Sequence, residues 1–316
     1  MSHTQIRDYF FKEGLIFYDS VINGAFSLER DLTPSLFESF ARKTGISTSM
    51  DKEDVLSNMG LVTQKGMTNA GCLLLAEKPS HFIVSATLSC ALFQGTTKTK
   101  ILDQKVYEGD ISELYQKGLI YLLSHLNTEF IIGSQREEQL ELPEAALREA
   151  LINALAHRDY RSSANVQVFI FQDRVEMVNP GGLVGGLTLK DLGKRSAPRN
   201  PLLFGILQRM GLVENIGSGI SRISEELEER HLPGPKFDVD DNWFSLIFPR
   251  TMKSSQKSSQ KITSLMAENP DITIAKLSEA VGIGERAIKK QIASLQSQNK
   301  IARIGPDKGG HWKVIN

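Results

Sequence analysis

The sequence lacks the features that mark secreted, membrane and disulfide-rich proteins. Its 316 residues include only two cysteines, Cys72 and Cys90, and they form no CxxC pair. No stretch approaches the roughly 18 uninterrupted apolar residues that a membrane-spanning helix needs. The first twenty residues also lack the layout of a secretory signal. These absences predict a cytoplasmic protein with no membrane partner, whose two thiols stay reduced in the core.

Two further absences exclude particular chemistries. The six histidines form no HExxH motif and no Cys/His cluster, so we expect no structural zinc site. A helicase motor needs a P-loop of the form GxxxxGK[ST]. The nearest candidate, Gly193-Lys194-Arg195-Ser196, has Thr188 where the first glycine should stand and arginine after the lysine. Helicase activity is therefore not expected from this chain.

The balanced charge of the chain hides two unlike parts. Lys+Arg and Asp+Glu both number 37, so the formal net charge is zero. Residues 251–260 hold four Ser, two Gln and two Lys, a composition that predicts a flexible linker. Residues 253–316 contain nine Lys and two Arg against three Glu and two Asp, a net charge of +6, which leaves −6 for residues 1–252. The pattern predicts a small basic domain joined to a larger acidic body.

The sequence pattern predicts several helices and strands in the first half of the body. Residues 1–30 are mixed and aromatic, and no element is assigned to them. Thr33 and Pro34 predict a helix start, and Gly45 predicts its end. A short helix is expected over 52–59, strands over 86–93 and 100–107, and a long amphipathic helix over 111–126. Residues 31–141 are thus predicted to form an α/β subdomain.

From residue 142 to 250 the pattern is helix, two strands, a glycine-rich loop, two helices and two strands. On the first helix, Glu149, Asn153 and His157 recur every four residues and form a polar stripe. Leu147, Leu151 and Leu155 have the same spacing on the other side. One face is predicted to enter the core while the other presents a carboxylate, an amide and an imidazole. An amphipathic helix with incidental polar residues is the alternative.

Two glycine-rich turns follow this helix. The strand after it ends in Asn179-Pro180-Gly181-Gly182. Further on, Gly217-Ser218-Gly219 leads directly into a helix, where free backbone N–H groups and the helix dipole favour a phosphate. A tight turn is the alternative for a lone GxG. The order of polar helix, strand-end glycines and helix-start glycines favours a nucleotide site.

These motifs resemble those of the GHKL (Bergerat-fold) ATPases, which include gyrase-type topoisomerases and histidine kinases. The resemblance implies that Asn153 ligates Mg²⁺ on the triphosphate of ATP and that Glu149 activates the attacking water in members that hydrolyse ATP. It places Asn179, Gly181 and Gly182 in the adenine pocket, with His157 on the same pocket-facing helix stripe. Gly217, Ser218 and Gly219 would lie under the phosphates. The loop 183–200 resembles an ATP lid, with Lys194, Arg195 and Arg199 suited to phosphate.

A narrower resemblance covers roughly residues 50–250. Glu149–Tyr160, Asn179–Leu183, Pro198–Leu202 and Gly217–Ile220 are similar to bacterial proteins labelled "RecG-like C-terminal" or transcriptional regulator, in which a divergent GHKL domain follows a Schlafen/AlbA domain. Two departures stand out. Asn179 stands where the GHKL relatives have the Asp that binds adenine. ATP affinity and the choice of base therefore do not follow from the resemblance. Residues 1–30 are at most a remnant of the Schlafen/AlbA domain, so its nucleic-acid binding is not carried over.

Residues 261–316 resemble a winged helix-turn-helix. Three helices are expected over 261–299, followed by strands over 301–304 and 311–315. In the third helix Arg286, Lys289, Lys290 and Gln291 are predicted to face away from the core and to enter the major groove of DNA. Arg303, Lys308 and Lys313 are candidate phosphate contacts, whereas Trp312 is expected in the core. A winged helix that contacts protein, with solvated lysines, is the alternative.

The sequence thus predicts an α+β protein with a GHKL-like α/β sandwich body and a C-terminal winged-helix domain. The leading hypothesis is a transcriptional regulator that binds double-stranded DNA and uses an ATP- and Mg²⁺-binding domain as its sensor or dimerisation body. A homodimer is expected, since a palindromic operator would require one. An Mg²⁺-dependent ATPase in DNA repair or phage defence is the second hypothesis. A scaffold with an empty pocket is the third.

Overall fold

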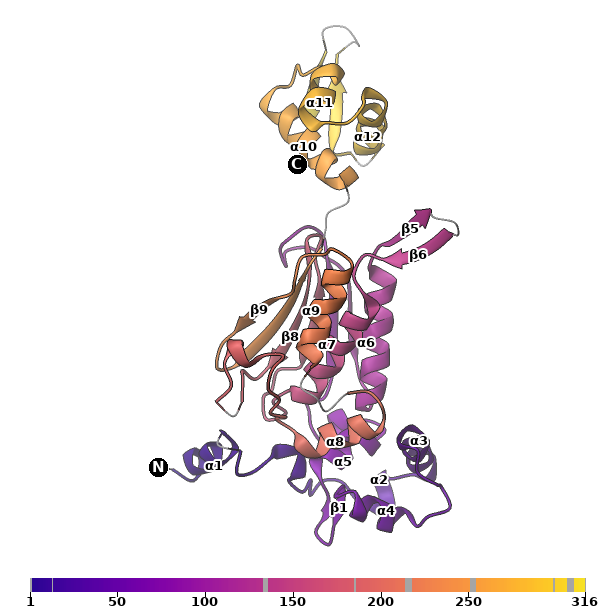
Figure 1. The fold of residues 1–316 in the computed structure, drawn as a ribbon, viewed down its shortest axis with the longest axis vertical. Helices are drawn as coiled ribbons and strands as arrows, with labels where there is room; N and C mark the ends of the chain where they lie inside the picture. The colour runs from indigo at the N-terminus through magenta and orange to yellow at the C-terminus, as the bar shows by residue number, and fades with distance from the viewer. Residues whose placement is uncertain are drawn as a thin grey trace. The chain divides into compact units, whose positions relative to one another are not determined.

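The protein forms two compact units, residues 1–250 and residues 251–316, in the computed structural model (Figure 1). The structure describes residues 2–12, 14–132, 136–184, 186–213, 218–250, 254–297, 299–305 and 310–315. Within these ranges, none of the helices combines the length and the apolar character needed to cross a membrane.

A mixed six-stranded sheet organises the first unit. Its strands are β3 (Leu88–Phe93), β4 (Ile101–Tyr107), β7 (Val166–Ile170), β8 (Arg174–Pro180), β9 (Lys236–Val239) and β10 (Trp243–Pro249). Their order across the sheet is β4-β3-β7-β8-β10-β9. Only β3 and β7 run parallel, and the other neighbours are antiparallel. The strands predicted over 86–93 and 100–107 are confirmed as β3 and β4.

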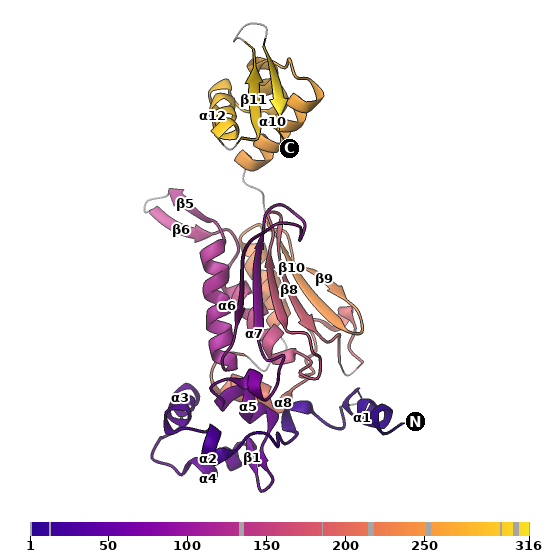
Figure 2. The same cartoon turned by 180° about the vertical axis from the view of Figure 1, so that it is seen from behind.

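Three helices cover one face of this sheet (Figure 1). They are α6 (Ile111–His125), α7 (Glu144–His157) and α9 (Gly219–Glu229). Alternate strand residues such as Leu88, Val168 and Met177 are buried against them in the main hydrophobic core. From behind, the strands lie in front of these helices (Figure 2). The predicted α/β sandwich is confirmed, and the cysteines Cys72 and Cys90 are buried in its core.

Short helices pack at one end of the sheet. They are α2 (Leu28–Asp31), α3 (Pro34–Thr44), α4 (Lys52–Asn58), α5 (Asn69–Leu75) and α8 (Pro201–Arg209), with the small ribbon β1 (Val62–Thr63) and β2 (Gly66–Met67). The predicted start and end of α3 are confirmed. The Thr33 side chain accepts from Leu36 N, and Gly45 adopts a left-handed conformation with φ of 69°. That conformation suits glycine because it carries no Cβ.

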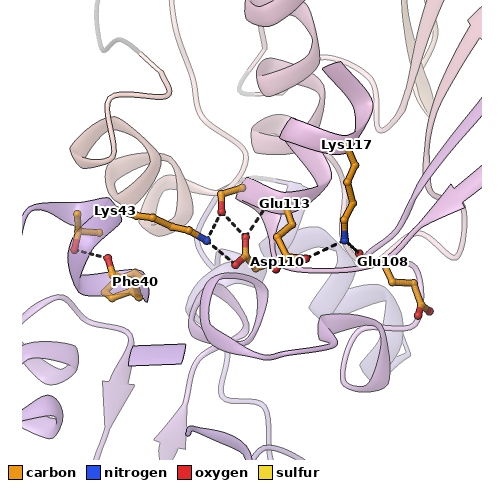
Figure 3. Close-up of polar contacts among 8 residues, drawn as sticks. Phe40, Lys43, Glu108, Asp110, Glu113 and Lys117 are labelled. Carbon is orange, nitrogen blue, oxygen red and sulfur yellow. Dashed lines mark hydrogen bonds and ion pairs between the residues drawn. The ribbon is translucent and has the colours of Figure 1, made fainter. Parts of the chain in front are cut away.

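A polar cluster ties α3 to the start of α6 (Figure 3). Lys43 Nζ lies 2.9 Å from Asp110 Oδ2 and 2.5 Å from Ser112 Oγ. Asp110 also caps α6, because its side chain accepts from Glu113 N at 2.9 Å. Lys117 forms a second bridge, donating to Glu113 and to Glu108 O. The cluster therefore holds the long helix against the short-helix end of the unit.

A protruding hairpin follows α6. Its strands are β5 (Thr128–Ile132) and β6 (Arg136–Leu140), which pair antiparallel. The sequence analysis assigned no element here. The hairpin forms a separate two-stranded sheet, so it lacks the hydrophobic face of a larger sheet that would have given an alternating pattern.

The second unit contains three helices and a hairpin. They are α10 (Ser254–Glu268), α11 (Ile274–Val281), α12 (Glu285–Ser297), β11 (Ile301–Ile304) and β12 (His311–Val314). The unit has its own core, which includes Ile262, Leu277, Ile288 and Trp312. The prediction that 251–260 form a flexible linker is wrong from Ser254 onwards, where α10 begins. No Gly or Pro interrupts residues 254–268, and the buried Ile262 and Met266 anchor the helix.

The first thirty residues, which the sequence left unassigned, form α1 (His3–Lys12), the 3₁₀ turn η1 (Tyr18–Ser20) and most of α2. Asp19 on η1 is fully buried and accepts from Leu203 N at 2.9 Å. Leu203 lies in the first turn of α8, whose N-cap residue Asn200 makes no capping bond of its own. Asp19 thus caps α8 from 184 residues away.

We predict that Asp19→Ala lowers the free energy of unfolding by about 1–3 kcal/mol, because it leaves buried N–H groups of α8 without an acceptor. Asp19→Asn keeps an acceptor oxygen and should lose much less. Urea unfolding of the wild type and both variants measures the difference. Equal losses for the two substitutions would show that packing, and not the hydrogen bond, holds η1 against α8.

Candidate functional site

A cavity opens between α7, the ends of β8 and β10, the loop after β8 and the start of α9. It encloses about 1020 Å³ of space, part of it open to solvent. Many residues predicted for a nucleotide site line it: Glu149, Asn153, His157, Asn179, Gly181, Gly182, Arg195, Arg199 and Gly219. Motifs spread over seventy positions of sequence therefore converge on one pocket.

Helix α7 supplies the polar wall. Leu147, Leu151 and Leu155 are at most 1% exposed, so the predicted core face is confirmed. On the other side Asn153 Nδ2 donates to Glu149 Oε1 at 2.8 Å. The two side chains that were expected to serve the triphosphate are thus hydrogen-bonded to each other.

Arg222 on α9 completes this polar group. Its Nη2 atom lies 2.6 Å from Glu149 Oε2. No local sequence pattern predicts this contact, because the partners are 73 residues apart. Glu149 accepts from both Asn153 and Arg222, so one lone pair on each carboxylate oxygen is directed at a protein group instead of water.

Gly219 allows α9 to approach α7 closely. A Cβ at this position would meet Glu149 Oε1 at 2.1 Å and Asn153 Nδ2 at 2.9 Å. Only glycine fits without displacing them. Ser218, the N-cap residue of α9, makes no side-chain capping bond, and Gly217 lies outside the described residues.

Asn179 lies at the opposite end of the pocket, near the end of β8 and paired with Phe244 of β10. Its side chain is buried at 4% exposure, and Oδ1 has no hydrogen-bond partner within the described structure. A buried acceptor without a partner costs free energy, so it calls for a donor. Met177, Phe244 and Leu246 provide apolar surface around it.

The two glycines after Asn179 are required by close backbone approaches. Gly181 has φ of 106°, a region that side-chain-bearing residues avoid. A Cβ at Gly182 would meet the Asp240 carbonyl oxygen at 2.1 Å. The chain therefore turns tightly against residues 240–242, between β9 and β10.

The predicted lid cations do not act as one group. Arg199 Nη2 donates to Gly182 O at 2.7 Å, and Nη1 lies 3.7 Å from Asp159 Oδ2, so Arg199 belongs to the Asn179 end of the pocket. Arg195 lines the pocket, with 74% of its side chain exposed, and pairs with Asp191 at 3.5 Å. Lys194 is exposed and is not among the lining residues. The three cations therefore have different surroundings, and their role towards phosphate stays a prediction.

His157 lies against Phe204, with ring centroids 5.5 Å apart. Burial, together with the positive charge of Arg199, lowers the pKa of His157 to about 4. The imidazole is therefore neutral at physiological pH, and it contributes polar surface without charge.

The two ends of the pocket fit a purine nucleotide to different degrees. The Asn179 end fits the base, because an unpaired buried acceptor stands in apolar surroundings. At the other end, Glu149 and Asn153 already have partners and would have to exchange them for Mg²⁺ and phosphate. No group of three metal-ligating side chains lies within the described residues, so a magnesium ion there would depend on the nucleotide's own oxygens.

The second unit exposes part of the predicted DNA surface. Arg286, Lys289 and Lys290 on α12 are exposed, and Lys313 on β12 is exposed. Gln291 instead accepts from Ser259 Oγ at 3.2 Å and so packs towards α10. Arg303 stacks on Trp312, 4.7 Å from the ring centroid. Trp312 is 7% exposed, which confirms its place in the core, and Lys308 lies outside the described residues.

One family model matches part of the chain. The family described as "Putative ATP-dependent DNA helicase recG C-terminal" matches residues 163–248. This segment is similar to a divergent ATPase-like domain and contains β7 to β10 with the lid loop, α8 and α9. The match does not reach α7. The family therefore gives no support for the roles of Glu149, Asn153 and His157, whose place in the pocket comes from the structure.

A solved structure shares the fold. The DIP2311 protein from Corynebacterium diphtheriae is 19% identical, with a TM-score of 0.63. The match covers 95% of this chain and 65% of that one, so this chain spans about two thirds of its length. At this identity the likeness concerns the fold alone. No curated protein matches the sequence significantly.

The pKa of His157 gives a testable pH dependence. The unfolded chain has a histidine pKa of about 6.5, whereas the folded value is about 4. The unfolded state therefore binds the proton first, and the free energy of unfolding should fall as the pH drops from about 6.5 towards 4. Urea midpoints at pH 7 and pH 5 should differ more for the wild type than for His157→Gln. Identical pH dependence in both would contradict a half-buried imidazole that stays neutral in the folded state.

Proposed function

We propose that the body binds an adenine nucleotide in the pocket and that the chain is a DNA-binding regulator with this pocket as its sensor. The observation that carries the nucleotide part is the unpaired, buried Oδ1 of Asn179 in an apolar pocket that also contains Glu149 and Asn153. The exocyclic amine of adenine is a donor of the required kind, and the amide oxygen replaces the carboxylate of GHKL relatives.

Each end of the pocket would hold one part of the ligand. Asn179 would accept from the adenine amine, with Phe244 and Leu246 against the base. Asn153 would face the phosphates, and a bound Mg²⁺ would neutralise part of their charge. The start of α9 at Gly219 would add a helix dipole favourable to an anion. The similarity of residues 163–248 to a RecG C-terminal, ATPase-like family supports this assignment.

A sensor is favoured over an ATPase by the state of Glu149. Its two oxygens are engaged by Asn153 at 2.8 Å and by Arg222 at 2.6 Å. One lone pair on each oxygen is thus directed at a protein group, whereas a general base directs a lone pair at its water. Nucleotide binding with little turnover therefore agrees best with this geometry.

The DNA part of the proposal is supported by charge and element order. Residues 253–316 carry a net charge of +6. Their three helices and terminal hairpin follow the order of a winged helix-turn-helix, and α12 exposes Arg286, Lys289 and Lys290. A third helix with an exposed cationic face suits the major groove.

Titration calorimetry with ATP and Mg²⁺ tests the nucleotide site. Asn179→Leu should weaken binding about tenfold or more, because the amine loses its acceptor, and Asn153→Ala should weaken the Mg²⁺-dependent part. Val178→Ala, on the same strand but facing away from the pocket, is the matched control and should bind normally. Absence of ATP binding to the wild type would overturn the sensor and the ATPase together.

DNA binding is tested by its salt dependence. We expect the double substitution Lys289→Ala and Lys290→Ala to weaken binding to duplex DNA and to reduce the slope of log affinity against log salt by roughly 1 for each lost phosphate contact. Lys261→Ala removes one exposed lysine from α10 and should have little effect. An unchanged affinity after deletion of residues 251–316 would refute the assignment of DNA binding to this unit.

A further inference from the structure

Strand β4 is an open edge of the six-stranded sheet. Among the described residues it pairs only with β3, so no strand covers its outer side, although Asp103 O accepts from the Tyr121 hydroxyl. Natural proteins usually protect such edges, because a second strand can add to them. Here the edge strand is seven residues long, and three of its large apolar side chains are exposed.

Those side chains are Ile101, Leu102 and Val106, at 50%, 57% and 58% exposure. The opposite edge, β9, has only four residues, follows Pro235 and exposes no large apolar side chain. The two edges of the same sheet therefore differ, and β4 alone presents the apolar surface that another strand could cover.

The sequence of β4 is complementary to itself. If two copies run antiparallel about a two-fold axis through Gln104, Asp103 of each faces Lys105 of the other. In the same register Leu102 faces Val106, and Lys100 faces Glu108. Moving the axis by one residue places Lys105 against Lys105 or Asp103 against Asp103, and like charges directly opposite are destabilising. Charge therefore favours the Gln104 register over the two registers next to it.

A bulge opposite Phe93 interrupts β4 near Leu102, so the regular part of the strand runs from Asp103 to Tyr107. Bulges and lysines on an edge normally discourage pairing. In this register, however, the lysine meets a carboxylate, and the Asp103–Lys105 pairs lie within the regular part. Asp103 keeps its contact with His125, at 3.3 Å.

Helix α6 offers a second contact beside the edge. Lys117 reaches Glu108 O and Tyr121 reaches Asp103 O, so this side of the helix borders β4. Between them in sequence, Ile120 is 66% exposed. Two edges joined about a two-fold axis would bring the two copies of α6 towards each other, where Ile120 gains a partner surface.

We propose that β4 is a homodimerisation surface and that its occupant is β4 of a second copy of this chain. The two strands pair antiparallel about Gln104 and form one continuous sheet with six strands from each copy. The interface concerns the oligomer alone, so it stands or falls separately from the nucleotide and DNA proposals.

Sedimentation velocity of the full chain tests the surface. The wild type should sediment as a dimer of twice the 35.1 kDa chain mass. Lys105→Asp places two carboxylates together at two symmetric positions and should raise the dimer dissociation constant about tenfold or more. Lys236→Asp makes the same charge change on β9 and should leave the dimer intact. Circular dichroism confirms that each variant is folded.

The charge swap supplies the decisive comparison. Asp103→Lys combined with Lys105→Asp restores opposite charges in the same register and should recover most of the affinity that either single change removes. A monomeric wild type at about 100 µM, a concentration that populates even weak homodimers, would overturn the proposal. So would a dimer that resists Lys105→Asp or dissociates with Lys236→Asp instead.

Discussion

The close packing of α9 against the polar side of α7 is the constraint on which the pocket depends. Leucines hold the opposite side of α7 on the sheet, so Glu149 and Asn153 must face the cavity. The polar side remains accessible only because α9 starts with a glycine, which leaves the Glu149 and Asn153 side chains in place. Arg222 then provides the charge that a carboxylate in this half-enclosed position needs.

This arrangement separates the pocket into two chemically different ends. At the Asn179 end a buried acceptor has no partner, and apolar residues shape the space. At the α7 end the acceptors are satisfied by protein groups. A ligand would therefore gain its base contacts directly, whereas its phosphates would compete with an existing ion pair. The competition gives the site a physical means to couple nucleotide binding to the position of α9.

Much of this could be predicted from local sequence. Thr33, Pro34 and Gly45 define α3 because capping is a short-range effect, and the i, i+4 spacing placed Glu149, Asn153 and His157 on one side of α7. Contacts between distant residues left no local signal: Asp19 caps α8, and Arg222 pairs with Glu149, without any periodic pattern.

Composition was misleading at residues 254–260, where Ser, Gln and Lys continue a helix anchored by later apolar residues. Loop charge was also a poor guide to position, since Arg199 points to the glycines and Lys194 to solvent.

The central claim is that Asn179 reads an adenine base. A crystal structure of the full chain with a non-hydrolysable ATP analogue and Mg²⁺ tests it most directly. We expect the adenine amino nitrogen within about 3 Å of Asn179 Oδ1, a normal hydrogen-bond distance, with the phosphates towards Asn153 and the start of α9. A base bound elsewhere, or a pocket that takes up no analogue at saturating concentration, would contradict it.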